Sequence, residues 1–276
     1  MKRILFPTDF SETVSNAFVH ALTLANQTNA ELILLHTFEY PIIDTQSFPA
    51  NYQQLFDSLE LAQFEMFKTE VYKLRAIAEV RKLNHVKMAH RLINSPLLQA
   101  IKTAIKEDAI DFVVMGTSGA SGWMSTFLGT QTGEVIKGVD VPVLAVPLEA
   151  IHERVATIGF TTRYRAKDKV ALQEVLIIAR KLHAAVKCLY VKKSNSDVTD
   201  ETVAQWNSDF AAEPVQFFIL PSDEVETTIL EFITNQGIDI IAMTTYKRSF
   251  FESLFATHFS EKMTYASTIP VLVLHE

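Results

Sequence analysis

Residues 111–147 read DFVVMGTSGASGWMSTFLGTQTGEVIKGVDVPVLAVP. Six of the eight glycines of the chain fall between Gly116 and Gly138, and none precedes residue 116. An apolar, strand-like run from Phe112 to Met115 leads into these glycines, and a helix is predicted to open at Thr130. A strand, a glycine loop and a helix N-terminus present free backbone N–H groups and a positive helix end to an anion. The stretch therefore predicts an α/β fold with a phosphate-binding loop.

Short apolar runs alternate with amphipathic stretches through the first half of the chain. The runs are almost continuously hydrophobic, as expected for parallel strands covered by helices on both faces. Such doubly wound sheets bind ligands at the carboxyl ends of their strands, where the winding reverses. The predicted strands are Arg3–Pro7, Glu31–His36, Lys87–Leu92, Asp111–Met115 and Val141–Val146, and the predicted helices are Ser11–Gln27, Gln53–Leu83, Pro96–Glu107 and Thr130–Val139.

The second half of the chain repeats the first. The matching segments are Asp111–Met115 with Asp239–Met243 and Val141–Leu144 with Ile269–Leu272, both at an offset of 128, and Ile4–Phe10 with Ile158–Tyr164. We therefore predict two tandem doubly wound domains of Rossmann-like or flavodoxin-like type, residues 1–148 and 153–276. Each should hold a five-stranded, mainly parallel sheet flanked by helices.

The last strands of the two copies, Val141–Val146 and Val271–His275, are candidates for pairing about a pseudo-two-fold axis. Such pairing would hide two sheet edges and make the chain an intrachain pseudo-dimer. Copy one also has a longer stretch between its second and third strands, with the excess around Phe38 to Phe56. Two readings of this excess stay open: a lid or interface, and a surface excursion packed on its own helix.

Composition limits the classes of function. The net charge is −7 and no basic block occurs, which argues against nucleic acid as a partner. No apolar run has the length needed to span a membrane, and the first residues enter a strand at once, so no signal peptide is expected. A single cysteine, Cys188, has no partner for an intrachain disulfide. We therefore expect a reduced, cytoplasmic protein.

The strand ends carry a spacing that resembles the nucleotide-binding members of the universal stress protein family. Those members have Gly, two residues, Gly, nine residues, and then Gly followed by Ser or Thr. Here Gly116-Thr-Ser-Gly119, nine residues and Gly129-Thr130 fit this pattern. The match extends to Asp9 after the first strand, to Leu35-His36 in the second and to the Val-Pro-Val-Leu of the last strand. The resemblance covers essentially the whole chain as a tandem pair.

This resemblance implies an adenine nucleotide, usually ATP, with Mg²⁺ or Mn²⁺ bound through the phosphates as an open question. In the sequence itself, no cluster of Asp, Glu or His indicates a dedicated metal cage, and no motif indicates a catalytic set. The implied binding residues are Pro7, Thr8, Asp9 and Thr37 around the base, Met115 and Gly116 under the ribose, Ser118 and Gly119 along the phosphates, and Gly129, Thr130 and Gln131 at the terminal phosphates.

Plainer readings of the same residues stay open. Asp9 is equally suited to cap the helix that starts near Ser11. The histidine His36 fits a strand-end residue with satisfied hydrogen bonds better than an acid or a base. The glycine loop as a whole can also be a tight turn that binds nothing.

Copy two has lost the pattern. At matched positions, Gly116 becomes Thr244, Gly119 becomes Lys247, Gly129 becomes Thr257, Thr130 becomes His258 and Asp9 becomes Arg163. Side chains now stand where backbone should face phosphate, so this copy should not bind ATP. Either it is a scaffold that covers a surface of copy one, or its basic cluster of Arg163, Lys247 and Arg248 binds another anion or an acidic partner.

The first functional hypothesis is a cytoplasmic, ATP-binding stress-response regulator or sensor. One alternative is a protein-interaction scaffold without functional nucleotide binding. The other is an ATPase, which would be slow because no lysine follows Gly129-Thr130 as in a Walker loop. The protein partners are unknown, and a homodimer is compatible with the tandem layout. The variant Gly119→Lys, which imports the copy-two residue, is predicted to abolish ATP binding.

Overall fold

The computed structural model describes residues 1–11, 14–41, 52–117, 130–150, 154–244 and 269–275. The first half contains β1 (Arg3–Pro7), α1 (Val14–Thr28), β2 (Glu31–Phe38), α2 (Tyr52–Val80), β3 (Met88–Asn94), α3 (Leu97–Glu107), β4 (Phe112–Gly116), α4 (Thr130–Gly138) and β5 (Val143–Val146). The second half contains β6 (Thr157–Thr161), α5 (Ala166–Leu182), β7 (Ala185–Lys192), α6 (Asp200–Asp209), β8 (Val215–Pro221), α7 (Val225–Gln236), β9 (Ile240–Thr244) and β10 (Val271–Leu274).

The strands of the described residues form one sheet in the order β3-β2-β1-β4-β5-β10-β9-β6-β7-β8. Within each half all neighbouring strands are parallel, and the two halves have the same order. The halves meet through β5 and β10, which pair antiparallel. The predicted α/β class, the doubly wound strand order of each half and the pairing of the last strands are therefore confirmed.

Most predicted elements lie close to the observed ones, and the differences have physical causes. Strands β2 and β3 each run two residues further than predicted because their ends pair with each other, Thr37 with Ile93 and Phe38 with Asn94. The helix α2 ends at Val80, three residues before the predicted end, because Lys82 has a left-handed backbone with φ of 58°.

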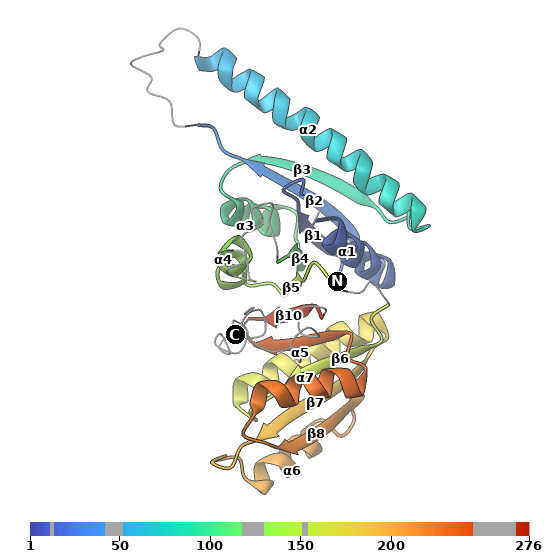
Figure 1. Ribbon diagram of the computed structural model, residues 1–276, viewed down its shortest axis with the longest axis vertical. Coiled ribbons are helices and arrows are strands. Elements are labelled where there is room, and N and C mark those ends of the chain that lie inside the picture. The colour runs from blue at the N-terminus through green and yellow to red at the C-terminus, as the bar shows by residue number, and fades with distance from the viewer. Residues whose placement is uncertain (12–13, 42–51, 118–129, 151–153, 245–268, 276) are drawn as a thin grey trace.

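Helices cover both faces of the sheet (Figure 1). One apolar layer packs α1, α2, α5 and α6 against alternate strand residues such as Phe6 and Phe160. The opposite layer packs α3, α4 and α7 against the residues between them, such as Leu5 and Ile241. Each layer contains residues of both halves, so the core is continuous across the β5–β10 pair. The predicted domain boundary between residues 148 and 153 stays a prediction.

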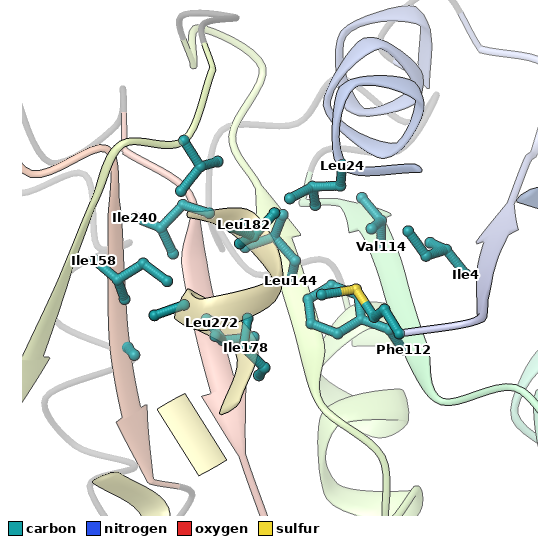
Figure 2. Packing of buried hydrophobic residues seen from close by; sticks show 14 of the residues in the cluster. Ile4, Leu24, Phe112, Val114, Leu144, Ile158, Ile178, Leu182, Ile240 and Leu272 are labelled. Atoms are coloured by element: carbon teal, nitrogen blue, oxygen red, sulfur yellow. The ribbon is translucent and has the colours of Figure 1, made fainter. Parts of the chain in front are cut away.

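Figure 2 shows this continuity at the junction of the halves, where Leu24 of α1 and Ile178 and Leu182 of α5 lie around Leu144 and Leu272. A polar contact adds to the apolar ones. The side chain of Gln27, near the end of α1, donates to the carbonyl oxygen of Val155 at 3.2 Å and accepts from the Val155 N–H at 3.1 Å. Because one amide satisfies both backbone groups, it fixes the start of the second half on the first.

The stretch between β2 and β3 supports the plainer reading of the excess in copy one, as far as it is described. The ring of Tyr40 lies 4.6 Å from that of Phe56, centroid to centroid, and the Tyr40 hydroxyl donates to Glu60 at 3.0 Å. The chain that leaves β2 therefore packs on the first turns of α2. The remaining residues of this stretch, 42–51, lie outside the described residues.

Candidate functional site at the strand ends of the first half

The candidate site lies where the winding of the first half reverses. The strand order 3-2-1-4-5 sends the chain to one side from β1 to β3 and to the other side from β4 to β5. The carboxyl ends of β1 and β4 are therefore the switch point at which doubly wound sheets bind ligands. The predicted residues Pro7, Thr8 and Gly116 all lie at these two strand ends.

The turn after β1 is held by two hydrogen bonds of Thr8. The N–H of Thr8 donates to the Leu35 carbonyl at 2.8 Å, and the Thr8 hydroxyl accepts from the N–H of Phe10 at 3.3 Å. Phe10 has a φ of 65°, the left-handed conformation that a non-glycine residue adopts only where its surroundings impose it. The turn thus presents Asp9 as an exposed side chain beyond the strand end.

The Asp9 carboxylate has a local role. One oxygen, Oδ1, accepts from the Ser11 N–H at 3.0 Å and from the Ser11 hydroxyl at 2.6 Å. This is the turn-forming geometry typical of aspartate before a helix. The other oxygen, Oδ2, makes no hydrogen bond within the described part of the chain, which leaves out the adjoining residues 12 and 13. The local role of Asp9 is therefore observed, and ligand binding by Asp9 stays a prediction.

The side chain of His36 is buried, and each ring nitrogen lies within hydrogen-bonding distance of an oxygen atom. Nδ1 lies 2.9 Å from the carbonyl oxygen of Thr8, and Nε2 lies 3.2 Å from the side-chain oxygen of Gln63 on α2. The ring of Phe10 stacks on it at 3.9 Å between centroids. His36 is thus the satisfied strand-end histidine that the sequence favours, and it connects α2 to the turn that carries Asp9.

The segments on either side of the glycine loop lie next to each other at the end of β4. The hydroxyl of Thr132, in the first turn of α4, donates to the carbonyl oxygen of Gly116 at 3.0 Å. The N–H of Thr117 donates to the carbonyl of Val146 at 3.0 Å. The N-terminus of α4 therefore sits directly beside the end of β4, which is the arrangement that places helix N–H groups next to a bound anion.

Gly116 itself is not required by the protein. Among the described glycines only Gly237 has a positive φ, so the backbone at Gly116 suits any residue. A Cβ built on Gly116 would lie 3.6 Å from the Cβ of Ala17, which is an ordinary van der Waals contact. The matched position of the second half is Thr244, whose side chain is buried. Neither the backbone conformation nor the contact of a Cβ with the described residues therefore demands glycine at this position.

The predicted site residues fall into three groups. Pro7, Thr8, Asp9, Thr37 and Gly116 lie at the carboxyl ends of β1, β2 and β4 as predicted, and Gln131 is exposed in the first turn of α4. Met115 belongs to the sheet, but its side chain is buried in the apolar layer under α3 and α4, so only its backbone can face a ligand. Ser118, Gly119 and Gly129 lie outside the described residues, and Thr130 is described only as the first residue of α4.

Two residues of this site were missed by the sequence reasoning. Thr132 ties α4 to β4, and its only sequence signal is a hydroxyl residue in a predicted first helical turn. Gln63 bonds His36 from the middle of a long helix, and no local pattern marks it. Both contacts join segments that are distant in sequence.

The second half repeats the turn but changes its content. Thr162 and Tyr164 reproduce Thr8 and Phe10: the Tyr164 N–H donates to the Thr162 hydroxyl at 2.8 Å, and Tyr164 has a φ of 58°. At this strand end the buried carboxylate of Asp168 accepts from the Arg163 N–H at 2.6 Å, the Thr162 hydroxyl at 3.1 Å and the Arg165 N–H at 3.3 Å. The protein's own carboxylate thus takes up the donors of this turn.

The predicted basic cluster of the second half is only partly described. Arg163 is exposed at the end of β6, while Lys247 and Arg248 lie outside the described residues. The neighbouring Arg165 binds Asp197 through two hydrogen bonds of 2.9 and 2.8 Å. A free anion site in this half therefore stays a prediction that rests on the sequence.

Metal sites and membrane-spanning helices are both absent from the part of the chain that the structure describes. Its residues include no group of three or more His, Cys, Asp or Glu side chains placed to hold a metal ion. None of its helices has the length and apolar character needed to cross a membrane.

This geometry defines a doubly wound α/β protein with its candidate site at the switch point of the first half. The family model of the universal stress proteins matches residues 1–147, and the chain belongs to the universal stress protein family. A universal stress protein of Methanocaldococcus jannaschii is 30% identical over 153 residues, which cover 52% of this chain and 94% of the relative. One of Thermus aquaticus is 32% identical over 147 residues, which cover 52% of this chain and 98% of the relative.

Solved structures match the whole chain. A universal stress protein of Archaeoglobus fulgidus aligns with 99% of this chain and 98% of its own, with a TM-score of 0.66 and 15% identity. A putative universal stress protein of Pseudomonas aeruginosa aligns with 100% of this chain and 93% of its own, with a TM-score of 0.59 and 12% identity. At these identities the likeness establishes the tandem fold.

Proposed function

We propose that this universal stress protein binds ATP at the switch point of its first half and acts as a nucleotide-dependent regulator in the cytoplasm. The observation that carries the proposal is Gly116, a glycine that neither its backbone conformation nor the contact of a Cβ with the described residues requires. A ribose or phosphate approaching the end of β4 supplies the missing reason, because it would occupy the space of a side chain.

The proposed contacts follow the strand ends from the base to the phosphates. Pro7, Thr8 and Thr37 line the adenine, and Asp9 accepts hydrogen bonds from the adenine or ribose through its second carboxylate oxygen. The backbone of Met115 and Gly116 passes under the ribose. The N–H groups of Ser118 and Gly119 follow the phosphates, and Gly129, Thr130 and Gln131 hold the terminal phosphates at the start of α4.

Two observations support the phosphate end of this site. The Thr132 hydroxyl holds the first turn of α4 against Gly116, so the positive end of the helix dipole lies beside the end of β4. The hydroxyl oxygen of Thr117 is buried and makes no hydrogen bond within the described part of the chain, which is uncommon for a polar group. A divalent cation, if bound, is held through the nucleotide phosphates.

In this proposal the second half is a cover. Asp168 satisfies its β6–α5 turn internally, and Thr244 fills the position of Gly116. These two changes leave one nucleotide site per chain. The role of the second half is then to bury the β5 edge of the first half, through β10. Nucleotide occupancy changes the surface around the glycine loop, and that change is the signal to protein partners.

The test is calorimetric titration of ATP and AMP, with and without Mg²⁺, into the wild-type chain and the variants Gly116→Ala and Gly116→Thr. We expect one site per chain. Gly116→Thr should weaken binding roughly tenfold to a hundredfold, because its side chain enters the ligand space. Gly116→Ala should have a smaller effect, and thermal unfolding without nucleotide should change little in either variant.

Three results would contradict parts of the proposal. Wild-type affinity in Gly116→Thr would remove the site from the end of β4. A second site per chain would assign binding to the second half as well. No binding by the wild type, with no nucleotide co-purified, would favour a protein-interaction scaffold. Turnover of ATP above background would add hydrolysis to the activity.

A further inference from the structure

The helix α2 exposes several large apolar side chains among its charged ones. Ten large hydrophobic residues of the described chain are exposed, and six of them belong to this helix. Among these six, Leu61, Phe64 and Tyr72 are 61%, 51% and 64% exposed. The inner side of the same helix, by contrast, places Phe67 and Leu74 in the core.

The exposed side has a defined repeat. Leu61, Glu65, Lys68 and Tyr72 follow one another at spacings of four, three and four residues, which is the spacing of a helix-pairing seam. The helix lies beyond the edge strand β3, at one end of the long axis of the molecule, and its outer side carries no other described element (Figure 1). All four residues of this repeat are exposed and are therefore accessible to a second helix.

The charges of α2 favour one direction of pairing. Residues 52–66 contain three carboxylates and no cation, whereas residues 67–80, up to the end of the helix, contain three cations and two carboxylates, and two further cations follow at Arg81 and Lys82. Two parallel copies would place like charges together. Two antiparallel copies place the acidic half of each helix against the basic half of the other, which is the complementary arrangement.

We propose that two copies of this chain associate through α2, packed antiparallel about a two-fold axis between residues 66 and 67. This register sets Leu61 against Tyr72 of the second copy and Glu65 against Lys68 of the second copy. Because the interface is isologous, each contact occurs twice. Within one chain Glu65 and Lys68 already form an exposed ion pair at 3.3 Å, which contributes little to stability and is free to exchange partners.

This interface uses neither the β5 edge nor the candidate nucleotide site. The β5 edge is already occupied by β10 within the chain. Dimerisation through α2 is therefore expected with or without nucleotide.

The first test is sedimentation equilibrium of the full chain over a concentration range of about 1–500 µM, where small interfaces dissociate. We expect a reversible monomer–dimer equilibrium. Leu61→Glu should weaken it about tenfold or more, because a carboxylate then faces Tyr72 of the second copy. The matched control is Val170→Glu on α5, since Val170 is 66% exposed but lies outside α2. A wild-type monomer at every concentration, or equal weakening in both variants, would overturn the proposal.

A charge exchange tests the direction of pairing. In a dimer of Glu65→Lys chains, the introduced lysine faces Lys68 of the second copy in both contacts. In a dimer of Lys68→Glu chains, the introduced carboxylate faces Glu65 of the second copy in the same way. Each variant alone should therefore dimerise more weakly than the wild type, and an equimolar mixture should recover dimers, because both cross-contacts become complementary. No recovery in the mixture would contradict the antiparallel register.

A disulfide test fixes the register independently of charge. A mixture of Leu61→Cys and Tyr72→Cys chains should cross-link under mild oxidation, whereas each variant alone should not. The native Cys188 is buried and does not interfere. Cross-linking of Leu61→Cys with itself would overturn the proposed register.

Discussion

Leu144 of β5 and Leu272 of β10 lie directly opposite each other across the antiparallel pair that joins the two halves. They are also equivalent residues of the repeat, since they occupy matched positions at an offset of 128. The flanking pairs, Ala145 with Val271 and Val143 with Val273, exchange with each other under the same symmetry. The pseudo-two-fold axis of the molecule therefore passes through the Leu144–Leu272 pair.

The junction predicts that the two halves unfold together. Both leucines are fully buried in the layer that contains residues of both halves. Leu272→Ala should lower the free energy of unfolding by about 2–5 kcal/mol, the usual cost of such a cavity. Amides of β1 and β4, in the first half, should lose protection from hydrogen exchange together with those of β9. The control is Ile177→Ala, an exposed apolar residue of the same half. Unchanged protection in the first half would show that the halves unfold separately.

The sequence predicts this junction because a repeat makes the long-range contact visible. Residues 141–144 and 269–272 match without a gap, and two equal edge strands satisfy their backbone groups by pairing with each other. The same reasoning cannot place Gln63 against His36 or the Thr132 hydroxyl on Gly116. These contacts depend on how a helix is rotated over the sheet, and no period in the sequence records that rotation.

The second half also shows where a matched alignment stops being informative. The alignment predicts that Arg163 replaces Asp9 and that the turn becomes cationic. It does not reveal that Asp168, the third residue of α5, supplies a buried carboxylate to the same turn. The chemistry at this strand end is therefore decided by a residue with no counterpart in the family motif.

Asp168 is predicted to be essential to the second half. Its carboxylate is fully buried and accepts from two backbone N–H groups and one hydroxyl. Asp168→Ala leaves these donors without their acceptor, so unfolding free energy should fall by about 2–4 kcal/mol in chemical denaturation. The control is Asp197→Ala, which removes an exposed partner of Arg165 and should change stability little. Equal effects of the two variants would mean that the internal carboxylate is dispensable.

Acid should weaken the junction through His275, the residue after β10. Burial lowers the pKa of His275 below its usual 6.5, although the carboxylate of Asp140 partly opposes this shift. Its Nε2 is buried without a hydrogen-bond partner in the described residues. Because the folded pKa lies below the unfolded one, the stability is complete above about pH 6.5 and decreases as the pH falls below it.

The measurement is the unfolding free energy of the wild type and His275→Gln between about pH 7.5 and pH 5. The variant should lose less stability over this range. A remaining loss is expected, because burial also lowers the pKa of His90. The control is His85→Gln, at an exposed histidine of the first half. A His275→Gln curve parallel to the wild type would exclude His275 as a source of the acid sensitivity.

We predict that the Thr132 hydroxyl strengthens nucleotide binding by holding the first turn of α4 beside the end of β4. Its hydroxyl is buried and donates to the Gly116 carbonyl at 3.0 Å. Thr132→Val keeps the shape but leaves that carbonyl without its donor, which should cost about 1–3 kcal/mol of unfolding free energy. It should also weaken ATP binding severalfold, because the first turn of α4 is no longer fixed beside β4. The matched control is Thr234→Val, whose hydroxyl donates within α7 at 3.1 Å. Wild-type ATP affinity in Thr132→Val, measured by calorimetry, would mean that the start of α4 does not hold the phosphates.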